Sequence, residues 1–400
     1  MDVQLPLISK AWQHVKALIG IDTHALVNED DIEGKLSLKA IAQCYPSHSA
    51  QSEIDKKLLY TPLIPGIDNF IGRDSQQQQL TDAIERWQNN KGELTAVIGP
   101  FGCGVSSFLN QFHQQYAQEH TVTYLSFYHG VLTTKEAIAN LCYCFNITEA
   151  PTSITAAIAL INQLPRHIII IDDLHKLMLR MMGNYQALVT FATMLMETRQ
   201  HHCWILGCET FVWHRLSSQY SITNFVKSII TLDYFSQQDL ADLLKQKTSQ
   251  ISLQLTDTND EETNNSLFDN MAKQLHQASD GHPKLACVLL LQALVNDGNS
   301  PITLNPISQP DLSSLKQCID EDLFSLAELY VHGGLRVFQH AEIFATSIEH
   351  SSLKLEYLAR QGLVKAHYSK QDFAQHYYLI TPTLTRIIAM HLLNHNKLYL

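Results

Sequence analysis

The chain has 400 residues, of which 45% are hydrophobic and 17% charged, and 39 acidic against 28 basic residues give a formal net charge of −11. This composition is typical of a globular protein of two or three domains and excludes a disordered chain. The acidic balance argues against a protein that coats nucleic acid non-specifically, since such binding needs many contacts between basic side chains and phosphates. No apolar run reaches the roughly 18 to 20 residues of a membrane helix, and we expect a cytoplasmic protein without membrane contact.

Residues 1–65 are predicted to form an accessory arm. The arm holds one predicted helix, Ile8–Ile19, followed by a polar stretch rich in aspartate, serine and glutamine. Pro62 and Pro65 mark a linker at its end. The arm carries no motif that points to a chemistry.

A short box and a helix precede the first predicted strand. The box is Phe70–Asp74, and the residues after it place Leu80, Ile84 and Trp87 on one helical face. On local grounds the box is also a loop-to-helix start in which Asp74 caps the helix.

The segment from Gly99 to Ser106 differs by one residue from the phosphate-binding loop G-x-x-x-x-G-K-[ST]. Gly99 and Gly104 hold the two glycine positions and Ser106 the hydroxyl position, but Val105 stands where the lysine should be. In such loops the backbone N–H groups surround phosphates, the lysine neutralises them, and the hydroxyl binds Mg²⁺. The predicted site therefore keeps its backbone donors and its metal ligand and lacks its cation.

The flanks of this segment have the required order of strand, glycine loop and helix. Leu94–Ile98 is a short apolar run that predicts a buried parallel strand, and Phe108, Leu109 and Phe112 predict the helix that follows. An ordinary strand-to-helix turn is the alternative. The candidate phosphate-binding residues are Gly99, Pro100, Gly102, Gly104, Val105, Ser106 and Ser107.

A second motif follows a predicted strand at 121–127 and a predicted helix at 134–144. Ile168–Ile171 predicts a strand buried on both faces, with Asp172 and Asp173 at its carboxyl end. In phosphate-loop enzymes the first acid holds the metal, and the second orients the attacking water. We therefore expect Asp172 to be a metal ligand with Ser106, and Asp173 to be the catalytic acid. Capping of the next helix, from Leu174 onward, is the alternative role for an aspartate here.

Together, the box, the glycine loop and the paired aspartates resemble the AAA+ ATPases of the origin-recognition and STAND type, a group that includes bacterial transposon and regulatory ATPases. The resemblance covers about residues 66–395 and implies an α/β fold: a parallel sheet with a helical lid and a C-terminal winged-helix domain. It implies ATP or ADP and Mg²⁺ as cofactors, with Phe70 to Arg73 along the adenine. That family usually has glutamate where Asp173 stands.

Three further assignments follow from the resemblance. After a strand at 203–207, Glu209 or Thr210 holds the place of the residue that senses the γ-phosphate, and Arg215 is the candidate for an arginine given to a neighbouring subunit of a homo-oligomer. A solvent-facing arginine is the alternative. Within Ala278–Lys284, Lys284 holds the position of a basic residue that faces the phosphates; a helix stop followed by a helix start is the alternative.

The last part of the chain predicts a small domain that resembles a winged helix. It comprises helices at 315–331, 339–346 and 351–361, strands at 363–368 and 375–380, and a closing helix at 383–393. The third helix of such a fold enters the DNA major groove, and its expected exposed positions are Ser351, Ser352, Lys354, Glu356 and Arg360. DNA contact and binding of an unidentified protein partner both remain open.

The predicted domains are an arm at 1–65, a core at 66–232, a lid at 233–297, a linker at 298–311 and the winged-helix-like domain at 312–400. The eight cysteines are interpreted as reduced thiols; Cys142, Cys144, Cys203 and Cys208 lack zinc-finger spacing. Without the loop lysine, hydrolysis should be poor unless Lys284 or Lys176 substitutes. We therefore predict a regulatory or scaffolding protein that binds nucleotide. The alternatives are an active ATPase switch that assembles on DNA and a nucleotide-free adaptor.

Overall fold

The computed structural model describes residues 34–44, 71–127, 130–180, 185–220, 222–248, 261–295, 303–370 and 372–399. The predicted helix Ile8–Ile19, the linker prolines Pro62 and Pro65, and Phe70 of the box lie outside these ranges. Within them, no helix is long and apolar enough to cross a membrane.

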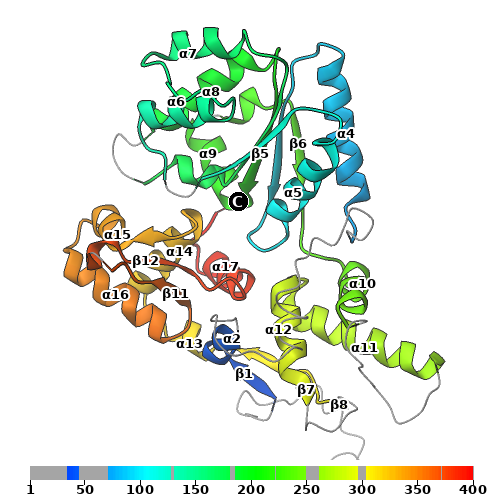
Figure 1. Cartoon of the computed structure of the whole chain (residues 1–400). Helices are drawn as coiled ribbons and strands as arrows, with labels where there is room; N and C mark the ends of the chain where they lie inside the picture. The colour runs from blue at the N-terminus through cyan, green and yellow to red at the C-terminus, as the bar shows by residue number, and fades with distance from the viewer. Residues whose placement is uncertain are drawn as a thin grey trace, which may run out of the picture.

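A five-stranded parallel sheet lies between the helices in the upper half of the molecule in the view of Figure 1. Its strands are β2 (Leu94–Gly99), β3 (Val122–Ser126), β4 (Ile168–Asp172), β5 (Cys203–Glu209) and β6 (Ser228–Thr231). The order across the sheet is β3-β4-β5-β2-β6, so the strand that precedes the glycine loop lies between β5 and β6. All carboxyl ends therefore meet at one edge, which is where open α/β sheets bind ligands.

Helices cover both faces of the sheet, and this explains the four consecutive isoleucines of β4. Ile168 and Ile170 face a core cluster built with α4 (Asp74–Gln88) and α5 (Val105–Tyr116). Ile169 and Ile171 face the opposite, larger cluster. Because alternate residues of a strand point to opposite faces, a strand covered on both sides must be apolar throughout. The predicted α/β class is confirmed.

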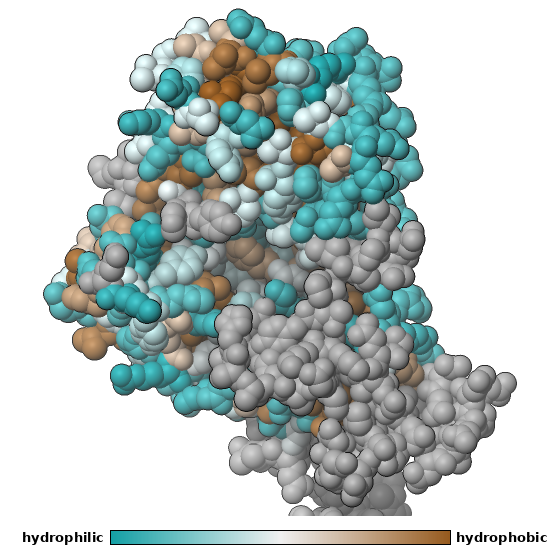
Figure 2. All heavy atoms as spheres, viewed as in Figure 1, coloured by the Kyte–Doolittle hydropathy of each residue, from teal (hydrophilic) through white to brown (hydrophobic). Residues whose placement is uncertain are grey.

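The larger cluster lies beneath four helices of the core: α6 (Thr134–Tyr143), α7 (Ile154–Ile161), α8 (Gln186–Thr198) and α9 (Thr210–Tyr220). Apolar residues gather at the surface over α7 (Figure 2), where Ile154 and Ile158 are only half-buried. On the other side of the sheet, α4 begins at Asp74 itself. The residue before it, Arg73, has a φ of 74° and makes no side-chain capping bond. The prediction that Asp74 caps this helix is therefore wrong.

The lid is helical, as predicted. It comprises α10 (Gln237–Thr248), α11 (Glu261–Ser279) and α12 (Pro283–Ala293). Ser236 caps α10, because its Oγ accepts the Asp239 N–H at 3.1 Å while Asp239 accepts the Ser236 hydroxyl at 2.6 Å. Between α11 and α12 the chain turns through Gly281 at a φ of 73°.

The C-terminal part contains the predicted helices and strands with two differences, a split first helix and an additional short strand, β10. It comprises α13 (Ser313–Lys316), α14 (Asp320–Val331), β10 (Leu335–Arg336), α15 (Val337–Phe344), α16 (Ile348–Arg360), β11 (Val364–His367), β12 (Tyr377–Ile380) and α17 (Thr385–Asn394). The single helix expected at 315–331 is split into α13 and α14. The carboxylate of Asp322 accepts the Ile319 N–H at 3.1 Å, and this bond starts a new helix there. The three strands form an antiparallel sheet in the order β10-β12-β11.

A short piece of the N-terminal arm joins this assembly. β1 (Lys35–Ser37) pairs in parallel with β9 (Gln309–Asp311), and α2 (Leu38–Cys44) follows. Leu38 and Ile41 of α2 are fully buried. Another short ladder pairs β7 (Leu294–Val295) with β8 (Thr303–Leu304). The predicted domain boundaries remain predictions.

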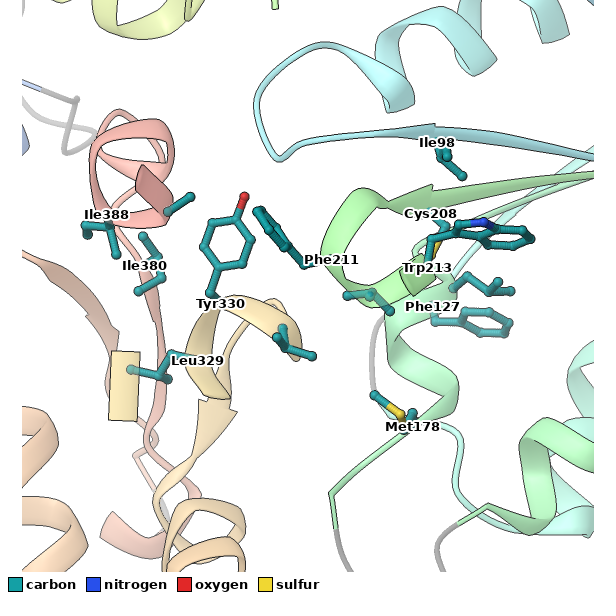
Figure 3. Close-up of a cluster of buried hydrophobic side chains, with 14 of the residues drawn as sticks. Ile98, Phe127, Met178, Cys208, Phe211, Trp213, Leu329, Tyr330, Ile380 and Ile388 are labelled. Atoms are coloured by element: carbon teal, nitrogen blue, oxygen red, sulfur yellow. The ribbon is translucent and has the colours of Figure 1, made fainter. Parts of the chain in front are cut away.

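Aromatic side chains join the C-terminal part to the core (Figure 3). Tyr330 of α14 and Phe211 of α9 point toward each other, with ring centroids 5.7 Å apart in an edge-to-face arrangement. Phe101 of the glycine loop lies edge-on to the same tyrosine at 5.1 Å. Tyr330 is 1% exposed, so the glycine loop and the C-terminal part share one core.

Candidate nucleotide site

The predicted site residues surround one pocket of about 210 Å³ at the carboxyl edge of the sheet. The lid forms one wall, through Phe235, Leu243 and Pro283. The candidate phosphate-binding, metal-binding and catalytic residues line this pocket, as do Arg73 and Lys284; the lining includes Arg73, Gly99, Pro100, Gly102, Gly104, Val105, Ser106, Ser107, Asp172, Asp173 and Lys284. Thr210, Arg215 and Lys176 do not line it. The structure thus brings together residues that are up to 211 positions apart in the sequence, from Arg73 to Lys284.

Two positions of the loop require glycine, because neighbouring atoms leave no room for a Cβ. A Cβ on Gly99 would lie 2.6 Å from the carbonyl oxygen of Leu232, and one on Gly102 would lie 2.2 Å from Nε2 of His282. Gly102 also has a φ of 89°, a conformation that disfavours other residues. The loop therefore lies tightly between strand β6 and the lid.

The end of the loop is arranged as a phosphate site requires. Gly104 has a φ of 107°, and a Cβ there would meet no atom within 4 Å, so the backbone is open toward the pocket. Helix α5 begins at the next residue, Val105, and its first N–H groups and positive dipole end favour an anion. Ser106 is exposed in the first turn. Val105 packs against the sheet cluster and contributes no charge.

Asp172 is held by two hydrogen bonds. Its Oδ2 accepts the Tyr124 hydroxyl at 2.8 Å, and its Oδ1 accepts the Asp173 N–H at 2.8 Å. A Cβ on Gly207 of the neighbouring strand would lie 2.5 Å from Oδ1, so glycine makes room for this carboxylate. The side chain is 4% exposed. A fixed carboxylate and the Ser106 hydroxyl in the lining of one pocket suit Mg²⁺, which prefers oxygen ligands.

Asp173 does not cap the next helix as the alternative interpretation expected. Its φ is 59°, and it makes no side-chain capping bond to the short helix at Leu174–Leu177. Oδ2 accepts the Ser126 hydroxyl at 2.6 Å instead. Burial raises the pKa of Asp173, and the charge of Asp172 raises it further. A carboxyl group with a raised pKa in this place is suited to proton transfer.

The cations around the pocket have different neighbours. Arg73 donates to the carbonyl oxygens of Cys103, at 3.3 Å, and Asp233, so its guanidinium holds the loop in place. Lys284, the second residue of α12, lines the pocket. Lys176 does not: it lines an adjoining cavity beyond the loop, where its Nζ donates to the Tyr377 hydroxyl at 3.1 Å. Of the two predicted substitutes for the loop lysine, Lys284 is therefore the one at the pocket.

Residues of the lid and the C-terminal part hold the tip of the loop. The carbonyl oxygen of Phe101 accepts the Tyr234 hydroxyl at 2.9 Å and the Thr385 hydroxyl at 3.2 Å. Nε2 of His282 lies 3.0 Å from that threonine hydroxyl. Sequence reasoning missed Tyr124, His282 and Thr385, because no local pattern links them to the loop.

Glu209 lies at the end of β5, next to Gly99 in the strand register. It lines the pocket, but its Oε2 accepts the Val212 N–H at 2.9 Å and its Oε1 accepts the Tyr330 hydroxyl at 3.3 Å. Its carboxylate thus caps α9 and contacts the C-terminal part. Burial raises the pKa of Glu209 to about 8.

This raised pKa predicts a pH-dependent stability. Between the unfolded pKa of about 4.3 and the folded value of about 8, the folded chain binds more protons than the unfolded chain, so the contribution of Glu209 to stability falls as pH rises. As the pH is raised from 5 to 9, we expect the melting temperature of Glu209→Gln to rise by a few degrees relative to that of wild type. If the difference in melting temperature between the two proteins is the same at pH 5 and at pH 9, this assignment is contradicted.

Arg215 is half-buried and paired within the chain, and its contact with a neighbouring subunit stays a prediction. Its Nη1 lies 3.4 Å from Oε2 of Glu328 in α14, and its side chain is 22% exposed. The arginine therefore joins α9 to the C-terminal part within the chain. The cysteines also have structural roles: Cys142, Cys144, Cys203 and Cys208 are buried free thiols, and no cluster of metal-binding side chains occurs among the described residues.

No protein-family model and no curated protein matches the chain. Solved structures do. The Aeropyrum pernix ORC2 protein in its ADP form is 13% identical, with 85% of this chain and 98% of that chain covered and a TM-score of 0.45. The Walker-type ATPase of Pyrococcus abyssi is 15% identical, with 80% and 97% covered and a TM-score of 0.42. Drosophila ORC bound to DNA is 12% identical, with 77% and 91% covered and a TM-score of 0.43. We infer no ligand or partner from similarities this low.

Proposed function

We propose that this protein binds ATP or ADP with Mg²⁺ at the pocket of the glycine loop and acts as a nucleotide-dependent regulatory or scaffolding protein with weak hydrolysis. The observation that carries the proposal is the convergence of the loop backbone, Ser106 and Asp172 on one pocket that contains Val105 in place of lysine. The backbone donors and the start of α5 would hold the phosphates. Ser106 and Asp172 would hold the metal, which neutralises phosphate charge.

Weak hydrolysis follows from the missing charge. Phosphoryl transfer is accelerated almost entirely by positioning and electrostatic stabilisation. Val105 supplies no cation at the terminal phosphates, whereas Lys284 enters the pocket from the lid. Asp173 would accept a proton from an attacking water, and because its pKa is raised, lowering the pH would protonate its carboxylate and prevent this step. Binding depends on the backbone donors and the metal and is therefore less affected than turnover.

Removal of the metal ligand tests this proposal. We expect wild-type protein to bind Mg²⁺–ATP in a calorimetric titration, and Asp172→Ala to weaken binding by at least about tenfold, because losing even a residue that only supports a metal ligand typically lowers metal affinity about 10- to 100-fold. Asp242→Ala is the matched control, since Asp242 is an exposed aspartate of α10. If wild-type protein releases no heat with about millimolar ATP, the chain is instead the nucleotide-free adaptor considered above.

DNA is not the partner that we propose for α16. The expected exposed residue Ser351 is buried, with its Oγ 3.0 Å from Nδ1 of His340. Lys354 is paired with Asp322 at 2.7 Å, and the face that reaches solvent carries Leu353, which is 72% exposed, and Tyr357. An apolar face of this kind suits a protein partner better than phosphates. The prediction that Ser351 is exposed is wrong because helix α15 packs over it.

A further inference from the structure

Helices α9 and α14 face each other across a groove of about 820 Å³. Each helix lines it with residues three or four positions apart, which is the spacing of one helical face. These are Phe211, His214, Arg215, Ser218 and Gln219 from α9, and Phe324, Ala327, Glu328 and Val331 from α14. The segments Met178–Arg180 and Lys397–Tyr399 complete the lining. The groove is separate from the pocket of the glycine loop.

Ion pairs fix the two walls of the groove relative to each other. Glu328 of α14 accepts from Arg180 at 2.6 Å and from Arg215 of α9 at 3.4 Å, and Nε2 of His332 lies 3.2 Å away. Glu328 is 3% exposed, and these three neighbours outweigh burial and lower its pKa to about 2. The network therefore stays charged at neutral pH and holds the groove in a formed state, which lowers the entropic cost of binding.

The charge of the groove differs from that of the chain. Three basic side chains, Arg180, Arg215 and Lys397, and one acidic side chain, Glu328, line it, in a protein of net charge −11. Arg215 is paired with Glu328 and Lys397 with Asp320 at 3.1 Å, and these two basic side chains are only 22% and 12% exposed. Arg180 is 60% exposed. Its guanidinium has five N–H donors, and one of them donates to Glu328. The rim therefore presents donors to an anionic ligand.

The same groove exposes apolar surface. Phe324 is 45% exposed and Tyr399 is 72% exposed, and Nζ of Lys397 lies 4.0 Å from the centroid of the Phe324 ring. Met178, Leu179 and Val331 add aliphatic lining. A preformed groove between two helices with apolar walls and aromatic anchors is the kind of surface that binds an amphipathic peptide.

We propose that this groove binds an acidic amphipathic segment of a partner protein, with apolar side chains between α9 and α14 and a carboxylate on the exposed guanidinium of Arg180. A nucleic acid fits less well, because a polyanion needs more cations than the three basic residues that line the groove, each of which is already paired with Glu328 or Asp320.

Fluorescence anisotropy with the full chain tests the proposal. The probe is a short fluorescein-labelled peptide that alternates glutamate with leucine and phenylalanine, beside the same peptide with lysine for glutamate. We expect the acidic peptide to bind and the basic one not to bind. Tyr399→Ala and Arg180→Gln should each weaken binding about five- to tenfold. The matched controls are Tyr143→Ala, at a tyrosine 71% exposed on α6, and Arg360→Gln, at an exposed arginine of α16; both should stay within about twofold of wild type.

Four results would overturn the proposal. The first is no binding of the acidic peptide by wild-type protein, and the second is equal weakening by the controls. The third is tighter binding of a labelled single-stranded oligothymidine that Tyr399→Ala and Arg180→Gln weaken, which would make the groove a nucleic-acid site. The fourth is self-association of wild-type protein in sedimentation that these two variants abolish, which would make the groove a contact between copies of this chain.

Discussion

A Val105→Lys variant is expected to hydrolyse ATP faster than wild type by on the order of 10²-fold, since one preorganised charge at the reacting phosphate is worth about that much. Val105 is the first residue of α5 and lines the pocket, so a lysine there starts beside the phosphate position. Asp172 and Asp173 line the same pocket and favour the added charge. The measurement is steady-state phosphate release at saturating ATP and Mg²⁺, with affinity from calorimetry.

Val105→Met is the matched control for this gain, because methionine has a similar length and no charge. It should leave turnover at the wild-type level, so that a gain in the lysine variant is electrostatic. Equal rates for both variants would mean that another part of the site limits hydrolysis. Lys284→Met in the wild-type background then tests whether the lid lysine supports the residual turnover. We expect this variant to hydrolyse ATP more slowly than wild type.

Tyr330→Ala is expected to cost about 3–5 kcal/mol of stability, the range for removing a large buried aromatic side chain. The ring of Tyr330 lies between Phe101 of the glycine loop and Phe211 of α9. Its removal would leave a cavity where the C-terminal part, the loop and the core meet. The measurement is the midpoint of urea unfolding followed by tryptophan fluorescence.

Tyr330→Phe separates packing from hydrogen bonding. It keeps the ring and loses only the bond from the hydroxyl to Glu209, which should cost about 1 kcal/mol. If the alanine and phenylalanine variants unfold at the same urea concentration, the aromatic contacts contribute nothing to stability. A loss of nucleotide affinity in Tyr330→Ala alone would show that the ring also supports the loop.

The sequence predicts those parts of the fold that are determined by residues close together in the chain. Ile168–Ile171 predicts a strand covered on both faces because its burial pattern is continuous along the chain. Gly99 and Gly104 predict a turn from strand to helix, since glycine accepts conformations that other residues avoid. The carboxyl ends of parallel strands then bring Asp172 to the same edge without further information.

The parts that the sequence does not predict depend on distant partners. Thr385 reaches the loop carbonyl of Phe101 across 284 residues, and β1 pairs with β9 across a similar separation. Ser351 is polar and lies on a helix, which suggests solvent, yet its hydroxyl is bonded to His340 of the preceding helix and to Thr346 of the turn between the two helices. Local propensity cannot distinguish a surface serine from one that satisfies a buried histidine.

The small ladder between β1 and β9 has a mechanical consequence. Helix α2 packs on α12 of the lid, and on its other side Lys39 is so close to the turn after α16 that a Cβ on Gly362 would lie 2.8 Å from its Cα. Residues 35–44 therefore tie the lid to the C-terminal part, and Arg386 of α17 adds an ion pair to Asp280 at the lid turn. Because the C-terminal part is itself joined to the core through Tyr330 and Glu328, the pocket of the glycine loop can open only if the lid breaks its contacts with α2 and α17 or the C-terminal part separates from the core.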